Sequence, residues 1–250
     1  MNTLQRLVLL FMPILAGCDS KIRTTVKVPF SIAPLTAPVQ IDDLRFFIHN
    51  VYLIDSRGNK LNFHFDSEQP ATQGVALIDL RKNSNRHFVS GWVQSIATSF
   101  SGIEFVVGVP FQLNHTDPLT APAPFNDMTM FWVWRDGYKF FRLDYQTDTD
   151  KPAYHLGSTG CQSPSPVRPP QQLCDQSNTI KITLHGFDPL VKGIKVNINA
   201  LIAAMDNVEN KRCTGNYAED NACLEVYSQL GLDAQTGNCI DNCKSQTLFQ

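Results

Sequence analysis

Residues 44–54 read Leu44-Arg45-Phe46-Phe47-Ile48-His49-Asn50-Val51-Tyr52-Leu53-Ile54, a long run rich in aromatic and β-branched side chains. Such a composition is typical of a β-strand. The run ends at Asp55-Ser56-Arg57-Gly58, a turn signal, and a second β-type segment returns from Lys60 to Phe65. These residues predict a β-hairpin built on one long strand.

Short β-type runs separated by turn residues cover most of the remaining chain. The expected strands are Thr25–Phe30, Val75–Leu80, His87–Val93, Ile103–Val109, Met128–Trp134, Tyr138–Tyr145, Thr179–His185 and Gly193–Asn199. Asp136-Gly137, between two of these runs, is a strong hairpin signal. Many short strands at this spacing predict an all-β single domain, either a β-sandwich or a barrel-like fold.

Helical patterns occur only near the C-terminus. Ile198–Met205 and Tyr217–Leu230 are each expected to contain a short helix. Two long irregular segments, Asn114–Asp127 and Gln146–Ser177, interrupt the strands, and each bears one histidine. Because long loops in a compact domain are usually functional or disordered, these two segments are candidates for the functional site.

The charge balance argues against nucleic-acid binding. The chain has 21 basic and 23 acidic side chains, a formal net charge of -2, and no basic block. A nucleic-acid interface needs a basic patch, so this function class has no electrostatic support. A hydrophobic content of 43% with 16 Phe is ample for a folded core.

The N-terminus has the features of a targeting segment. Arg6 precedes the apolar run Leu7–Ala16, which is too short to span a bilayer as a helix. The run ends in Leu15-Ala16-Gly17-Cys18, which resembles the lipobox of bacterial lipoproteins. The resemblance implies that residues 1–17 are a signal peptide and that Cys18 carries the lipid.

On this interpretation residues 18–25 form the lipidated cysteine and its tether, and residues 26–250 form the folded domain. We expect a lipid-anchored protein of the bacterial cell envelope that faces the periplasm. An ordinary secretory signal, in which the position of Cys18 is accidental, is the alternative.

Six further cysteines follow Cys18. An even number in an exported protein favours disulfides, although six cysteines allow fifteen connectivities. A zinc site is the rival, but no pair has the close spacing of a zinc knuckle. The simplest pairing is local: Cys161–Cys174, Cys213–Cys223 and Cys239–Cys243.

The segment Met128-Thr129-Met130-Phe131-Trp132-Val133-Trp134 carries an unusual row of side chains. In a strand, Met130, Trp132 and Trp134 would point the same way. That arrangement would form an oxidisable, electron-rich stripe between the two histidine-bearing loops. A well-packed aromatic core is the ordinary interpretation of the same pattern.

Among the six histidines, His115 and His155 stand out because each is expected in a turn. His49 would share a strand face with Phe47 and Val51, where it is either a ligand or a core imidazole. Imidazoles without a nearby carboxylate cluster suit copper or zinc better than calcium or magnesium. Asp117 is a further candidate, as a ligand or as a partner that orients His115.

Hydrolytic chemistry has weak support. His155 and Ser158 are close in sequence, but Gly157-Ser158-Thr159-Gly160 is not a nucleophile elbow. The chain contains no HExxH, P-loop or dinucleotide-binding pattern.

Several segments together resemble the MbnP-like copper-binding family, from about Val26 to Phe249. The segments that carry the resemblance are Leu44–Leu53, Gly108–His115, Met130–Phe140 and His155–Cys161. Cys161, Cys174, Cys213 and Cys223 fit the cysteine pattern of the family, whereas Cys239 and Cys243 lie outside it.

The resemblance implies chemistry that composition alone does not reveal. In relatives a di-haem partner, a MauG/MbnH-like enzyme of the peroxidase family, oxidises one tryptophan to kynurenine, which joins histidines in a copper site. Carried onto this sequence, the candidate is Trp132 or Trp134, with Trp132 preferred. His115 and His155 are the first candidate ligands, His49 is the third, and Asp117 and Met130 are outside candidates.

The expected protein is therefore a copper-binding substrate of its partner enzyme and not itself a catalyst, with a role in copper acquisition or handling. Two rivals stay open. One is an interaction module that uses the aromatic strand and long loops to bind a polysaccharide or a protein without metal. The other is a secreted hydrolase that uses His155 and Ser158.

Overall fold

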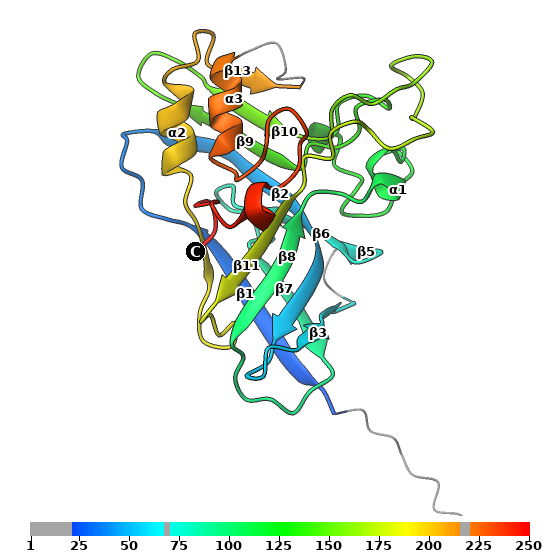
Figure 1. Cartoon of the computed structure of the whole chain (residues 1–250), viewed down its shortest axis with the longest axis vertical. Helices are drawn as coiled ribbons and strands as arrows, with labels where there is room; N and C mark the ends of the chain where they lie inside the picture. The colour runs from blue at the N-terminus through cyan, green and yellow to red at the C-terminus, as the bar shows by residue number, and fades with distance from the viewer. Residues whose placement is uncertain (1–21, 68–70, 216–220) are drawn as a thin grey trace, which may run out of the picture.

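The structure is a computed structural model that describes residues 22–67, 71–215 and 221–250. Its strands form a four-stranded sheet in the order β12-β1-β7-β4 and a nine-stranded sheet built around β2 (Figure 1). The strands are β1 (Thr24–Ile32), β2 (Gln40–Ile54), β3 (Lys60–Asn62), β4 (His64–Phe65), β5 (Ala71–Thr72), β6 (Val75–Asp79), β7 (Phe88–Val93), β8 (Gly102–Val107), β9 (Phe141–Gln146), β10 (Ala153–Leu156), β11 (Ile180–His185), β12 (Ile194–Val196) and β13 (Arg212–Thr214). The helices are α1 (Phe111–Asn114), α2 (Asn199–Met205) and α3 (Asn221–Ser228), with short 3-10 helices η1 (Met128–Met130) and η2 (Ile240–Cys243).

The two sheets pack face to face through aromatic rings. The ring centroid of Phe30 on β1 lies 5.7 Å from that of Phe46 on β2 and 6.1 Å from that of Phe105 on β8. Phe249 packs against Phe46 and Phe105, each at 5.3 Å. The predicted all-β sandwich is confirmed, and in the described part of the chain neither sheet closes into a barrel.

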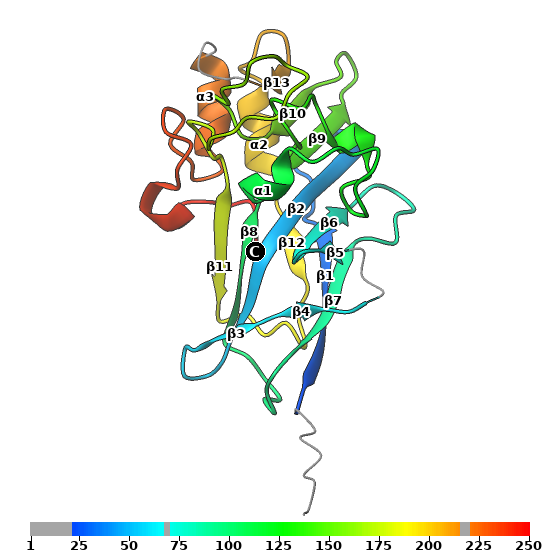
Figure 2. The same ribbon diagram turned by 90° about the vertical axis from the view of Figure 1, so that its right-hand side faces the viewer.

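β2 is the organising strand of the nine-stranded sheet. Its first half pairs with β9 and its second half with β8, while β6 and β3 also pair with it. In Figure 2 this strand runs between the upper end, where the helices and long loops lie, and the lower end, where β1 begins. The predicted hairpin is confirmed as β2–β3, but Lys60–Phe65 is not one strand, because His64–Phe65 leaves to pair with β7 in the other sheet.

Residues 43–49 of β2 are buried on both faces of the strand, which explains why apolar side chains there do not alternate with exposed polar ones. Leu44, Phe46 and Ile48 belong to the core between the sheets, whereas Phe47 belongs to a second apolar cluster outside it. A β-bulge follows at Asn50, whose φ is 49°, and it shifts the register of β2 against β8. Val51 therefore points into the core with Phe46 and Ile48, and the expectation that it shares a face with His49 is wrong.

The second apolar cluster attaches a long excursion of the chain to the outer face of β2. The chain leaves the sheet after β8 and re-enters it at β9, and residues 108–140 between them contain α1 and η1. Rings of this excursion cover Phe47, whose centroid lies 5.7 Å from that of Phe125 and 5.6 Å from that of Tyr138. The excursion and the loop of residues 157–179 lie together at the upper right of Figure 1.

The expected strand Met128–Trp134 is wrong. Met128–Met130 forms η1, Phe131 makes an isolated bridge with Tyr138, and a turn follows. The physical reason is a local cap: the Asp127 side chain accepts from the backbone N–H of Thr129 and starts the 3-10 turn. The Asp136-Gly137 turn signal is real, but it closes this irregular hairpin and not a pair of regular strands.

The late helices are confirmed as α2 and α3, although residues 217–220 of the second expected segment lie outside the described part of the chain. The three disulfides are those of the simplest local pairing. The expected signal peptide and Cys18 also lie outside the described residues. None of the helices described is long and apolar enough to span a membrane.

Candidate metal centre

His115 lies at the end of α1, and a hydrogen bond fixes which of its ring nitrogens carries the hydrogen. Its Nδ1 lies 2.9 Å from the backbone carbonyl oxygen of Trp134. Because a carbonyl only accepts, Nδ1 must carry the hydrogen, and Nε2 of the neutral ring keeps its lone pair. Burial lowers the pKa of His115, so the neutral ring predominates at pH 7. A backbone partner on the far nitrogen is the usual way in which a metal-binding histidine is oriented.

Asn114 connects this histidine to both flanking segments. Its Nδ2 donates to Ser158 Oγ at 2.8 Å and lies 3.3 Å from His115 Nε2, while its Oδ1 accepts from the backbone N–H of Tyr138. Gly137 makes the approach possible, since a Cβ there would lie 2.5 Å from the Asn114 carbonyl oxygen. The buried Asn114 thus fixes the position of His115 against the hairpin and the second loop.

Trp132 lines the larger cavity next to this histidine. The cavity has a volume of about 690 Å³ and is also lined by Arg135, Ser158, Thr159 and Cys161. The indole packs on Gly157, where a Cβ would lie 2.4 Å from its Cζ3 atom. Trp132 is half-buried, so the ring is held by the protein on one side and faces an open space on the other.

Trp134 has a different environment from Trp132. Its side chain packs at the edge of the second apolar cluster, and its contact with the histidine is through the backbone carbonyl. Trp132 and Trp134 do not form an exposed stripe, because the expected strand is a turn. The prediction of an aromatic strand, on which the alternative of a metal-free interaction module depends, is therefore wrong.

His49 lies at a second cavity, of about 490 Å³, which is lined by neighbours of His115 and not by His115 itself. Phe111, Asn114 and Cys174 also line this cavity. Both ring nitrogens of His49 are buried, and neither makes a hydrogen bond with another described group. Burial lowers the pKa of His49, and the neighbouring Asn50 opposes this shift only in part. A buried imidazole without a hydrogen-bond partner has donor capacity that the fold leaves unused.

His155 belongs to a different group of side chains. It lies in β10, not in the expected turn, and its Nε2 is 2.6 Å from Asp144 Oδ1. Burial raises the pKa of Asp144, but hydrogen bonds from His155 and Arg142 outweigh this and lower it to about 2. His155 is thus part of a charged cluster on β9 and β10 with Asp144 and Arg142, and its Nε2 is already engaged.

Met130 and Asp117, the remaining candidate metal ligands, have structural roles. Met130 is fully buried in the second apolar cluster. Asp117 accepts from the backbone N–H of Leu119 and so closes a local turn. The hydrolase alternative needs Ser158 and His155 to act as a pair. Ser158 instead accepts from Asn114, and His155 bonds to Asp144.

Comparison with known proteins places this geometry in a family. The sequence profile of the MbnP family matches residues 9–219, most of the chain. The chain belongs to the MbnP family. The solved structure of MbnP from Methylosinus trichosporium has the same fold, with a TM-score of 0.78 at 18% sequence identity, over 92% of this chain and 98% of that chain. No curated protein sequence matches the chain.

The residues that this MbnP-family fold brings together fit the copper site that the resemblance implies. His115 has a lone pair on Nε2, which accepts from Asn114 Nδ2, and the neutral His49 ring has one lone-pair nitrogen that is buried without a hydrogen-bond partner. Cys174 lines the cavity of His49, and its Sγ lies 3.9 Å from His115 Nε2, so Cys174 lies near both histidines. Imidazole donors of this kind suit copper.

Sequence reasoning missed two parts of this centre. One is Asn114, whose position directly before His115 was the available signal. The other is the disulfide Cys161–Cys174, which lies against the His115 ring. The spacing of the cysteines predicted this bond. It gave no sign that His115, 59 positions before Cys174, would lie against it.

Proposed function

We propose that this protein is an exported copper-binding protein whose site is formed by histidines and a tryptophan oxidised to kynurenine by a di-haem, MauG/MbnH-like partner enzyme. His115 is the principal ligand, His49 the second, and Trp132 the oxidised residue. Membership of the MbnP family supports this assignment. The observation that carries it is the hydrogen bond from His115 Nδ1 to the Trp134 carbonyl oxygen, which ties a ligand-ready imidazole to the tryptophan hairpin.

The surroundings of Trp132 support its selection over Trp134. Its indole faces the cavity of about 690 Å³, whereas Trp134 packs against the second apolar cluster. Opening the indole ring would expose an aniline nitrogen and a ketone oxygen, which turns a donor-only side chain into one that can bind a metal. Bound copper would supply Lewis acidity and a redox couple, while the chain orients His115 through Trp134 and Asn114.

The proposed location is the bacterial cell envelope, with a lipid at Cys18 that anchors the domain on the periplasmic side. The proposed role is copper acquisition or handling, and the proposed protein is a substrate of its partner and not an enzyme. The pairing of all six cysteines after Cys18 supports export, because disulfides persist in oxidising compartments.

The test is mass spectrometry of protein made with and without the di-haem partner. We expect a partner-dependent gain of about 4 Da, the mass change of covalent Trp-to-kynurenine conversion, on a peptide that spans residues 128–135. Trp132→Phe should abolish the gain and Trp134→Phe should keep it. Copper stoichiometry of the same samples should follow the modification. An unmodified peptide beside a partner that is active on another substrate would refute the proposal.

A further inference from the structure

Two sulfur atoms outside the proposed histidine–kynurenine set lie beside His115. The His115 ring and the sulfurs of Cys161 and Cys174 lie within 4.8 Å of one another, and the two sulfurs are joined as a disulfide. We propose that this disulfide is a redox gate. When it is reduced, the two thiolates and His115 Nε2 form a sulfur-rich site that binds Cu(I).

One of the donor distances already suits a shared ion. Zinc bonds of about 2.3 Å to sulfur and 2.0 Å to nitrogen, the nearest available reference, place donor atoms of one tetrahedral ion roughly 3.5–4 Å apart. His115 Nε2 lies 3.9 Å from Cys174 Sγ. The Cys161 sulfur lies within 4.8 Å of a ring nitrogen of His115, so reduction has to let the two sulfurs separate and Cys161 approach the ring. Soft thiolate ligands select Cu(I) over harder cations.

The backbone keeps both cysteines in place without the disulfide. Thr159 and Gln176 form an antiparallel bridge, with N···O distances of 3.0 and 3.1 Å. Asn178 Nδ2 adds a bond of 2.8 Å to the Gly157 carbonyl oxygen. Cys161 and Cys174 each lie two residues from this bridge, so they remain neighbours after the bond is broken.

Polar neighbours favour the reduced, metal-binding form of the sulfurs. Ser158 Oγ lies 3.6 Å from Cys161 Sγ and accepts from Asn114 Nδ2 at 2.8 Å. Because its oxygen is already used as an acceptor, the Ser158 hydroxyl hydrogen is available to the sulfur. Its hydrogen bond would stabilise a thiolate at Cys161 more than a thiol.

The disulfide is also reachable from both sides. Cys161 lines the cavity of about 690 Å³ and Cys174 lines the cavity of about 490 Å³. Cys213 and Cys223, by contrast, are 1% and 2% exposed. A small dithiol can therefore attack the first bond in preference to the second.

The reaction balances without further components. A dithiol donates two electrons and two protons to the disulfide and becomes a disulfide itself, and the protein gains two thiols. Cu(I) binding then releases those two protons as the thiolates form. Both sites use His115, but neither step needs kynurenine or the di-haem partner, so a titration of unmodified protein tests this site without testing the proposed function.

The experiment uses unmodified protein made without the partner, with Cys18, Cys239 and Cys243 replaced by Ser so that they add no thiols. Protein reduced with excess dithiol and desalted under argon is titrated with Cu(I) against a chromogenic Cu(I) chelator. We expect one Cu(I) per chain, bound at least about tenfold more tightly than by the oxidised chain, with sulfur-to-copper absorption in the ultraviolet. Far-ultraviolet circular dichroism checks that the reduced chain is folded.

Two variants in this background decide the assignment. Cys161→Ser/Cys174→Ser should lose the tight binding although the buried Cys213–Cys223 pair is still present. His115→Ala should weaken it about tenfold while the thiol count stays the same. Equal binding by the double-serine variant, unchanged binding in His115→Ala, or a reduced chain that is unfolded would each overturn the proposal.

Discussion

The imidazole of His115 donates its Nδ1 hydrogen to the backbone carbonyl oxygen of Trp134, 2.9 Å away. A residue at the end of α1 is thereby oriented by the backbone of a turn 19 positions later in the chain. The bond leaves the lone pair of His115 Nε2 on the side of Asn114 and Cys174, where it accepts from Asn114 Nδ2 at 3.3 Å. The tryptophan hairpin and the histidine form one unit, so a change in either should affect the other.

Removal of the His115 imidazole should abolish high-affinity copper binding by partner-matured protein. We expect His115→Ala to weaken copper affinity by roughly 100-fold or more, since loss of groups that only support a metal ligand already costs 10–100-fold. Competition titration with a copper chelator measures the effect. His185→Ala, at an exposed histidine, is the control. If both variants bind alike, His115 is not a ligand.

The stability of the apo protein should fall as the pH falls through about 6.5. Burial lowers the pKa of His49 and of His115 below the ordinary value of about 6.5, so the unfolded chain binds these protons first. Stability is then fully present above pH 6.5 and is lost below it, by at most about 1.4 kcal/mol per pH unit for each group. Urea unfolding at a series of pH values measures the slope. His49→Leu should reduce this slope, and an unchanged slope would show that His49 does not contribute.

A methyl group at Gly157 should displace Trp132. Its Cβ would lie 2.4 Å from Trp132 Cζ3 and 2.8 Å from the Tyr138 carbonyl oxygen, so the indole must move. We expect Gly157→Ala to cost about 1–3 kcal/mol of stability, as overpacking does, and to shift the tryptophan fluorescence. It should also reduce partner-dependent oxidation. Gly58→Ala, where a Cβ meets nothing within 4 Å but the φ of +84° strains any other residue, measures the cost of backbone strain alone, which Gly157→Ala does not incur.

Arg45 should anchor the excursion that carries the tryptophans. This guanidinium on β2 is 1% exposed and bonds to Asp43, to Asp127 Oδ2 at 2.6 Å and to Thr129 Oγ1 at 2.9 Å. Arg45→Ala leaves the Asp127 carboxylate without its guanidinium partner and leaves Asp43 with Arg142 alone, at 3.2 Å, and it should destabilise the fold by about 3–5 kcal/mol.

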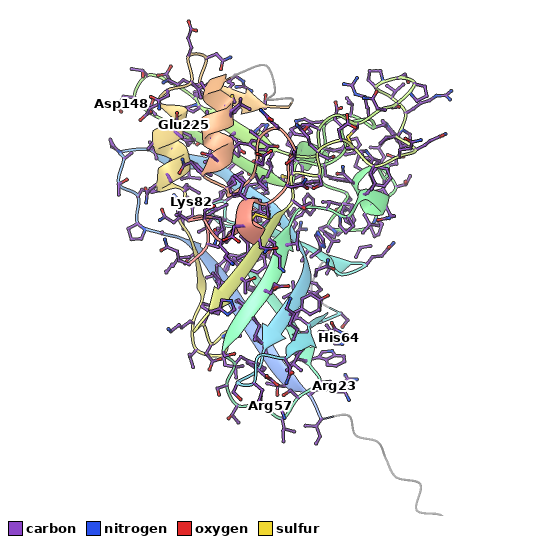
Figure 3. All side chains as sticks on the ribbon, in the orientation of Figure 1. Arg23, Arg57, His64, Lys82, Asp148 and Glu225 are labelled. Atoms are coloured by element: carbon purple, nitrogen blue, oxygen red, sulfur yellow. A yellow bond between two sulfur atoms is a disulfide. The ribbon has the colours of Figure 1, made fainter. Side chains whose placement is uncertain are left out.

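The matched control is Arg57→Ala, measured by the same denaturant titration. The Arg57 side chain is 84% exposed at the lower end of the molecule (Figure 3), and its pair with Asp55 spans 3.6 Å. Removal of an exposed pair of this kind should change stability by less than about 1 kcal/mol. A similar small effect in Arg45→Ala would mean that the Asp127 end of the excursion is held by other contacts.

The sequence predicted the features that depend on interactions between residues close together in the chain. The long strand of residues 44–54, its turn at Asp55–Gly58 and the late helices were readable because side-chain composition and turn residues act over a few positions. The local disulfide pairing was readable for the same reason. The segment Met128–Trp134 was not, since a single side-chain cap from Asp127 outweighs its β-type composition.

Within the candidate site, the sequence by itself determined the residue types: an imidazole in an Asn-His pair, two tryptophans before an Asp-Gly turn, and cysteines with local spacing. Only the tertiary structure decided which of them meet. It placed His155 beside Asp144 and not beside His115, and it brought His49 to the cavity next to Cys174. The physical reason is that the face of β2, the bulge at Asn50 and the packing of the excursion on β2 decide where each side chain points. These features depend on contacts between segments that are distant in the sequence.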